Sequence, residues 1–74
     1  MEASIFQKRI KEAKEKKEKI KLIFQYPASP RATIKRGYVI ESFEDGFDFQ
    51  EIMDGLVTYS YRFLVEIKIE DQNA

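Results

Sequence analysis

The first twenty residues have the hydrophobic spacing of an amphipathic helix. Four apolar positions are separated by four, three and seven residues and share one narrow stripe of a helix: Phe6, Ile10, Ala13 and Ile20. Lys and Glu recur at i,i+4 spacing on the other positions, which favours an exposed helical face. Ser4 followed by Gln7 fits an N-terminal capping box. The pattern predicts a basic amphipathic helix that follows a Ser4 cap and ends at residue 19.

From Ile20 onward the hydrophobic period changes from 3.6 to 2 residues, which is typical of strands. The alternation predicts five strands, over residues 20–26, 32–43, 47–53, 56–61 and 65–70. Segment 27–30 has proline at both ends and is expected to form a rigid turn. Asp-Gly pairs at 45–46 and 54–55 are hairpin signals. Gly37 lies inside the second strand and predicts a bulge or a bend there.

One helix followed by five short strands predicts a mainly β, single-domain fold. We expect a small five-stranded antiparallel barrel of the SH3-like or Sm-like type, because closing the sheet removes its edge strands. Residues 1–19 then form the helix, 20–70 the barrel and 71–74 a frayed tail. The alternative is an open, curled antiparallel sheet with the helix packed over one face.

Two segments resemble the Veg family of small bacterial proteins. They are residues 32–41 (Ala-Thr-Ile-Lys-Arg-Gly-Tyr-Val-Ile-Glu) and residues 57–66 (Val-Thr-Tyr-Ser-Tyr-Arg-Phe-Leu-Val-Glu). The resemblance implies an SH3-like barrel and a role in biofilm regulation without a defined biochemical activity. The order of elements is also similar to that of Sm-like proteins, whose bacterial members bind RNA as rings.

The composition removes most catalytic chemistry from consideration. The 74 residues include no Cys and no His, so the chain has no thiolate nucleophile, no zinc ribbon and no imidazole base. We therefore expect no enzyme, no cofactor, no metal and no small-molecule substrate. The longest uncharged run, residues 22–30, is far shorter than the roughly 20 apolar residues that span a bilayer. A cytoplasmic protein that does not act on membranes is the expectation.

The charges are unevenly distributed, although 13 basic and 13 acidic residues cancel. Residues 8–36 carry a net +8 and residues 37–74 a net −7. Such asymmetry indicates a polyanion-binding face or an acidic partner face, unless the two blocks compensate each other within the fold. Six carboxylates lie between residues 41 and 54 without a cation, and we expect them to be solvated. Among them, Glu51 is predicted to share a strand face with Phe47 and Phe49.

Nine residues are candidates for a binding surface: Lys14, Lys17, Arg31, Lys35, Arg36, Tyr38, Tyr59, Tyr61 and Arg62. Tyr59 and Tyr61 are two apart and would share a strand face. If Tyr38 neighbours them, the three rings form a stacking surface beside basic side chains, as in single-stranded nucleic-acid sites. Alternatively, the tyrosines pack at the barrel rim or line a peptide groove.

Three functions are compatible with these patterns. The leading expectation is a binding or regulatory module that acts on a protein partner through the surface of the barrel. The second is a nucleic-acid-binding protein that uses the basic helix, the cations at 31, 35 and 36 and the surface tyrosines. The third is a structural module that self-associates through opposed charged faces.

Overall fold

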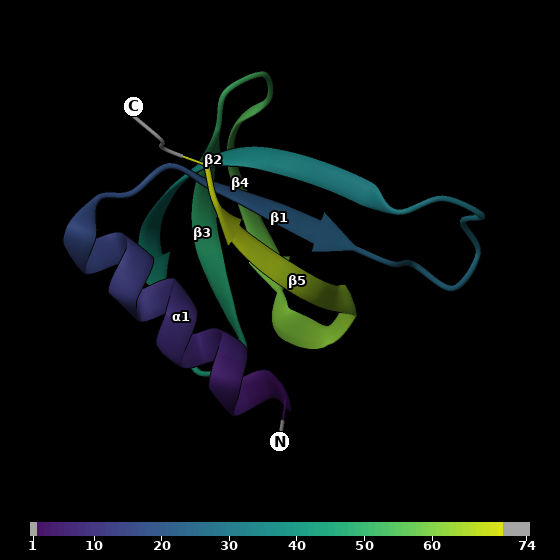
Figure 1. The fold of residues 1–74 in the computed structure, drawn as a ribbon, viewed down its shortest axis with the longest axis horizontal. Coiled ribbons are helices and arrows are strands. Elements are labelled where there is room, and N and C mark those ends of the chain that lie inside the picture. Colours follow the sequence, from purple (N-terminus) through teal and green to yellow (C-terminus); the bar gives the residue numbers. More distant parts are fainter. Residues whose placement is uncertain (1, 71–74) are drawn as a thin grey trace.

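The computed structural model describes residues 2–70 and shows one helix and one five-stranded antiparallel sheet (Figure 1). The elements are α1 (Glu2–Lys16), β1 (Ile20–Phe24), β2 (Thr33–Ser42), β3 (Gly46–Glu51), β4 (Gly55–Ser60), the 3₁₀ turn η1 (Tyr61–Phe63) and β5 (Leu64–Ile69). The mainly β fold with an N-terminal helix is therefore confirmed. The predicted frayed tail, 71–74, lies outside the described residues.

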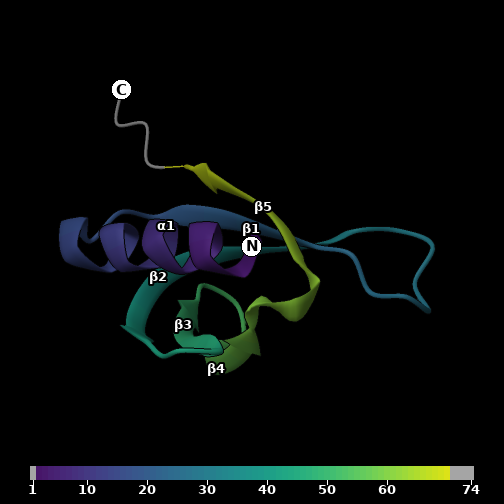
Figure 2. The ribbon, with the colours of Figure 1, turned by 90° about the horizontal axis from the view of Figure 1, so that it is seen from below.

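The sheet is curled and open. Its strand order is β4-β3-β2-β1-β5, so β4 and β5 form the two edges and do not pair with each other. In Figure 2 the long β2 bends from the layer of β1 and β5 into the layer of β3 and β4. The prediction of a closed barrel is not confirmed, and the arrangement corresponds to the alternative of an open, curled sheet.

The core lies between these two layers and is capped by α1. The buried side chains come from the helix, from the 3₁₀ turn η1 and from every strand except β4: Ile10, Ala13, Ile20, Leu22, Phe24, Val39, Phe47, Phe49, Tyr61, Leu64 and Ile67. Of the predicted helical stripe, Ile10 and Ala13 are buried against the sheet and Phe6 packs partly buried beside them. Ile20 was wrongly assigned to the stripe, because the helix ends at Lys16 and Ile20 begins β1. Burial of these apolar groups supplies the main driving force for folding.

The ends of α1 differ from those predicted. The helix begins at Glu2, so Ser4 lies within it and is not its N-cap, and it ends at Lys16 rather than at residue 19. Lys17 has a φ of 55°, a left-handed conformation that L-residues rarely adopt. The N–H of Lys17 donates to the carbonyl of Lys14 (3.2 Å) and that of Glu18 to Ala13 (3.1 Å). These two bonds form a Schellman motif, which turns the chain into β1.

Two positions in the sheet require glycine for different reasons. Gly55 has a φ of 82° and follows the β3–β4 turn, as the Asp-Gly signal predicted. Gly37 does not mark a bulge; the register between β2 and β3 shifts instead between Val39 and Glu41. A Cβ added at Gly37 would clash with the backbone carbonyl of Gln50 in β3. Glycine is therefore needed at this position for close strand approach.

Candidate functional site

The three tyrosines predicted to stack do not share a surface. Tyr38 lies on the outer face of β2 and is exposed, whereas Tyr59 is half-buried against Phe24 and Phe47. Tyr61 lies in η1 rather than in a strand and is only 5% exposed. Burial raises the pKa of its phenol, with a smaller contribution from the nearby Asp45 carboxylate. The predicted stacking surface is therefore wrong, because the 3₁₀ turn directs Tyr61 into the core.

The predicted cations are also dispersed. Arg31 is exposed in the β1–β2 loop, Lys17 forms the turn after α1, and the guanidinium of Arg62 lies 5.5 Å from the centre of the Phe63 ring. Lys14 on the helix pairs with Glu41 of β2. The nine candidates thus do not form one groove.

Ion pairs connect the basic and acidic blocks of the sequence within the fold. Lys14 pairs with Glu41, and Lys35 pairs with Asp54. Arg36 pairs with Glu70, with 3.0 Å between Nε of the arginine and Oε2 of the glutamate. The basic and acidic blocks therefore partly neutralise each other within the fold. This was the alternative to a binding face, and it accounts for part of the charge asymmetry.

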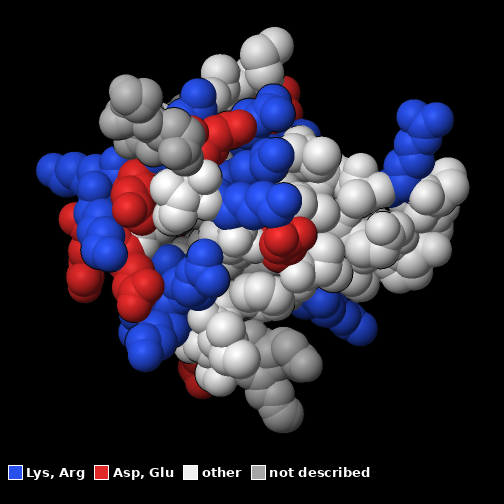
Figure 3. Space-filling model, in the orientation of Figure 1, with Lys and Arg blue, Asp and Glu red and all other residues white. Residues whose placement is uncertain are grey.

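A row of three cations lies on the outer face of the sheet, and only one of them, Arg36, is among the nine residues predicted from the sequence. Lys21 of β1 lies opposite Arg36 of β2 on one side and opposite Lys68 of β5 on the other. We call these three side chains the cation row. Figure 3 shows this side of the molecule, with Lys and Arg side chains across the middle of the face, over β1 and its neighbours. Strand alternation places Lys21 and Lys68 outward, but their alignment with Arg36 depends on the register between strands.

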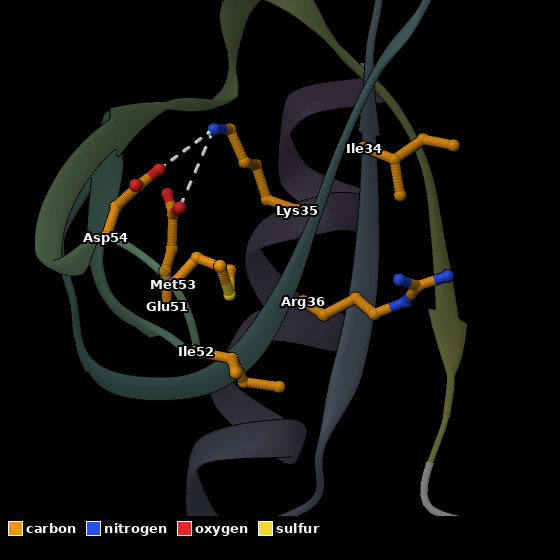
Figure 4. Close-up of a pocket in the computed structure, with 7 residues that line it drawn as sticks. All are labelled: Ile34, Lys35, Arg36, Glu51, Ile52, Met53 and Asp54. Carbon is orange, nitrogen blue, oxygen red and sulfur yellow. Dashed lines mark hydrogen bonds and ion pairs between the residues drawn. The ribbon is translucent and has the colours of Figure 1, made fainter.

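A hollow of about 250 Å³ lies beside the β3–β4 turn (Figure 4). Its lining combines apolar and charged side chains from β2, the end of β3 and the turn: Ile34, Lys35, Arg36, Glu51, Ile52, Met53 and Asp54. In Figure 4, Lys35 points toward Asp54 and Glu51, whereas Arg36 points away from them, across β1 toward β5. Lys35 and Arg36 are neighbours in the sequence, but their side chains therefore point toward different parts of the surface.

Lys35, Glu51 and Asp54 form an ionic cluster at one wall of this hollow. The Nζ of Lys35 lies 3.2 Å from Oδ2 of Asp54 and 3.6 Å from Oε1 of Glu51. Glu51 is only 4% exposed, so the expectation of a solvated carboxylate is wrong for this residue, although its shared face with Phe47 and Phe49 is confirmed. Its Oε2 has no hydrogen-bond partner among the described residues.

The surroundings of the cluster shift the three ionisation equilibria in different directions. Burial raises the pKa of the Glu51 carboxyl, and hydrogen bonding to Asp54 raises it further, against the opposing effect of Lys35. The hydrogen bond from Lys35 lowers the pKa of Asp54. The same bond raises the pKa of Lys35. Folding thus favours protonated Glu51 and ionised Asp54.

Glu51→Gln is expected to change the pH dependence of stability. Because the folded-state pKa of Glu51 is raised, its contribution is most favourable below its ordinary pKa of 4.5 and is lost as pH rises through the folded-state value. The variant has no ionisable group at this position and does not lose stability in this way. Its free energy of unfolding should therefore rise relative to that of the parent chain as the pH increases from 4 to 7. Urea denaturation at several pH values measures the difference. A constant difference would show that folding does not raise the pKa of Glu51.

Three large apolar side chains among those that line the hollow are open to solvent. Met53 is 88% exposed, Ile52 56% and Ile34 51%. We call these three side chains the apolar patch. Leu56, the second residue of β4, is also exposed. Exposed apolar groups gathered around a concavity are typical of interaction sites.

In comparisons with known proteins, no family model, curated protein or solved structure matches the chain. Within residues 2–70, no group of three or more Asp or Glu side chains is placed to hold a metal ion. In the same part of the chain, no helix is both long and apolar enough to cross a membrane.

Proposed function

We propose that this protein is a non-enzymatic binding module that holds a segment of a protein partner at the apolar patch. The observation that carries the proposal is the exposure of Ile34, Ile52 and Met53 around one hollow. Complete burial of such a side chain is worth about 1.5–3 kcal/mol, and a partner gains part of this because Ile34 and Ile52 are about half exposed and Met53 is almost fully exposed. Lys35 in the lining is already ion-paired with Glu51 and Asp54, so an apolar partner group would not separate these charges from their partners.

The proposal includes a finer fold class, an SH3-like or Sm-like small barrel of the Veg type. Three features support it: β5 returns to pair with β1, β2 is bulged and bent, and a 3₁₀ turn precedes β5. The segments that resemble Veg correspond to β2 and to the run from β4 through η1 into β5. By this proposal the chain acts in the cytoplasm as a regulatory adaptor.

The nucleic-acid alternative has less support, because Tyr59 and Tyr61 pack inward and cannot stack on exposed bases beside Tyr38. Self-association also remains an alternative, since both edges of the sheet lack a partner strand among the described residues. Light scattering at several protein concentrations separates a monomeric binder from a self-associating chain.

A selection from a random-peptide library tests the proposed function. Peptides enriched on the parent chain should carry an apolar residue and should lose about tenfold or more in affinity for an Ile52→Ser, Met53→Ser variant, which corresponds to about 1.4 kcal/mol. A Lys11→Ser, Lys16→Ser variant on the exposed helix face is the matched control and should bind as the parent chain does. Equal affinity for the patch variant and the parent would contradict the proposal.

A further inference from the structure

The cation row brings three like charges together on neighbouring strands. Lys21 pairs in register with Arg36 and with Lys68, and strands lie about 4.8 Å apart, so the row extends over about 10 Å. Like charges directly opposite each other destabilise a sheet. The row sits on the outer face, and none of its three side chains belongs to the buried core.

The carboxylates near the row neutralise it only in part. Glu70 pairs with Arg36 at 3.0 Å and Glu66 lies 3.9 Å from Lys68, whereas Lys21 has no ion pair among the described residues. The side chains of Arg36 and Lys68 are each 53% exposed. Exposed pairs of this kind contribute about 0–1 kcal/mol, so a better-placed anion can displace them. The cations of the row are therefore accessible to a further anion.

Arg36 connects the row to the apolar patch. It lines the hollow together with Ile34 and Ile52, and the backbone N–H of Ile52 donates to its carbonyl at 3.1 Å. Figure 4 shows its side chain leaving the hollow on the side of β1 and β5, where the other two cations lie. The patch and the row thus form one continuous surface, apolar at the hollow and basic beyond it.

We propose that the occupant of this surface is an acidic, extended segment of another protein. One apolar side chain enters the hollow between Ile34 and Met53, and neighbouring Asp or Glu side chains bind the cation row, starting at Arg36. Arg36 can bind a carboxylate through two parallel hydrogen bonds. This inference rests on the proposed protein-binding function and adds the chemistry of the partner: an apolar anchor flanked by carboxylates.

The surface favours an acidic peptide over a nucleic acid. A phosphate backbone carries closely spaced charges along its whole length, and Glu66 and Glu70 beside the row would repel it. A peptide can place its carboxylates at selected positions and leave neutral residues opposite those glutamates. The hollow also accepts an aliphatic side chain, which nucleic acids lack.

The proposal is tested by fluorescence anisotropy with four labelled probes at low and moderate salt. The probes are a short glutamate-rich peptide with one central Leu, the same peptide with Ser in place of Leu, a Leu peptide with Gln replacing Glu, and a single-stranded oligonucleotide of equal charge. The Glu/Leu peptide should bind best and should weaken with added salt. The other two peptides should each bind about fivefold to tenfold more weakly.

Charge reversal assigns the binding to the row. Lys21→Glu and Lys68→Glu should each reduce affinity for the Glu/Leu peptide about fivefold to tenfold and leave the Gln/Leu peptide unaffected. Lys11→Glu makes the same change in net charge on the exposed face of α1 and should leave affinity for both peptides as in the parent chain, within about twofold. Circular dichroism checks that each variant folds.

The outcomes separate the inference from the proposed function. Equal binding of the Glu/Leu and Gln/Leu peptides overturns the inference and leaves the apolar binding module standing. If neither peptide binds, both the inference and the proposed function are wrong. Preferred binding of the oligonucleotide, lost in Lys68→Glu, assigns the row to nucleic acid and overturns the inference. Self-association of the chain that is lost in the same variants assigns the surface to a second copy and also overturns it.

Discussion

Phe47→Ala is expected to lower the free energy of unfolding by about 3–5 kcal/mol. Phe47 is fully buried, and its ring lies 5.4 Å from that of Tyr61, 6.0 Å from Tyr59 and 6.1 Å from Phe49, measured between centroids. Removing it leaves a cavity at the centre of this aromatic cluster. Domains of this size have a stability of about 4–11 kcal/mol in total, so the loss is a large fraction of it. Urea denaturation followed by circular dichroism measures the change.

The matched control for this prediction is Met53→Ala, which removes a large apolar side chain that is almost fully exposed. We expect it to change stability by less than about 0.5 kcal/mol. If the two substitutions had similar costs, the assignment of Phe47 to the core would be wrong.

Gly37→Ala is expected to cost about 3 kcal/mol, at the upper end of the range for overpacking. The new methyl group would clash with the backbone carbonyl of Gln50, and neither backbone can move freely, because Gly37 pairs with Ile20 of β1 and with Glu51 of β3. The strain would separate β2 from β3 at the point where Glu51 enters the ionic cluster. Thermal and urea unfolding of the variant measure the cost.

Gly55→Ala distinguishes this clash from an ordinary glycine effect. Gly55 has a positive φ, but an added Cβ there would meet no atom within 4 Å. The substitution should therefore cost only the left-handed backbone strain, about 1–2 kcal/mol. Equal costs for the two alanine variants would contradict the close approach at Gly37.

The two strongest predictions and the proposed site concern the same part of the fold. Gly37 allows β2 and β3 to approach, and this approach places Glu51 beside Lys35 and brings the β3–β4 turn next to the start of β2. The hollow and the apolar patch result from that arrangement. Variants that open the β2–β3 pairing should thus lose partner binding even where the chain remains folded.

Local patterns in the sequence were sufficient for much of the fold. The change of hydrophobic period located one helix and five strands, the Asp-Gly signal located the β3–β4 turn, and alternation placed Glu51 on the face of Phe47 and Phe49. These features depend on residues a few positions apart, and their geometry follows from the helix and strand repeats themselves. The ends of elements were less accurate, since Lys17 and Tyr61 adopt conformations that their residue types do not signal.

The candidate site depended on contacts between distant segments. Alternation directs Lys21, Arg36 and Lys68 outward, but only the register of three strands aligns them, and register is set by packing across the whole sheet. In the same way, the burial of Glu51 and its pairing with Lys35 follow from the curl of the sheet around the core. Residue patterns along the chain thus account for the elements and the faces of this protein. Which faces adjoin is a property of the folded chain, because side chains remote in sequence meet only when β2 bends and the strands come into register.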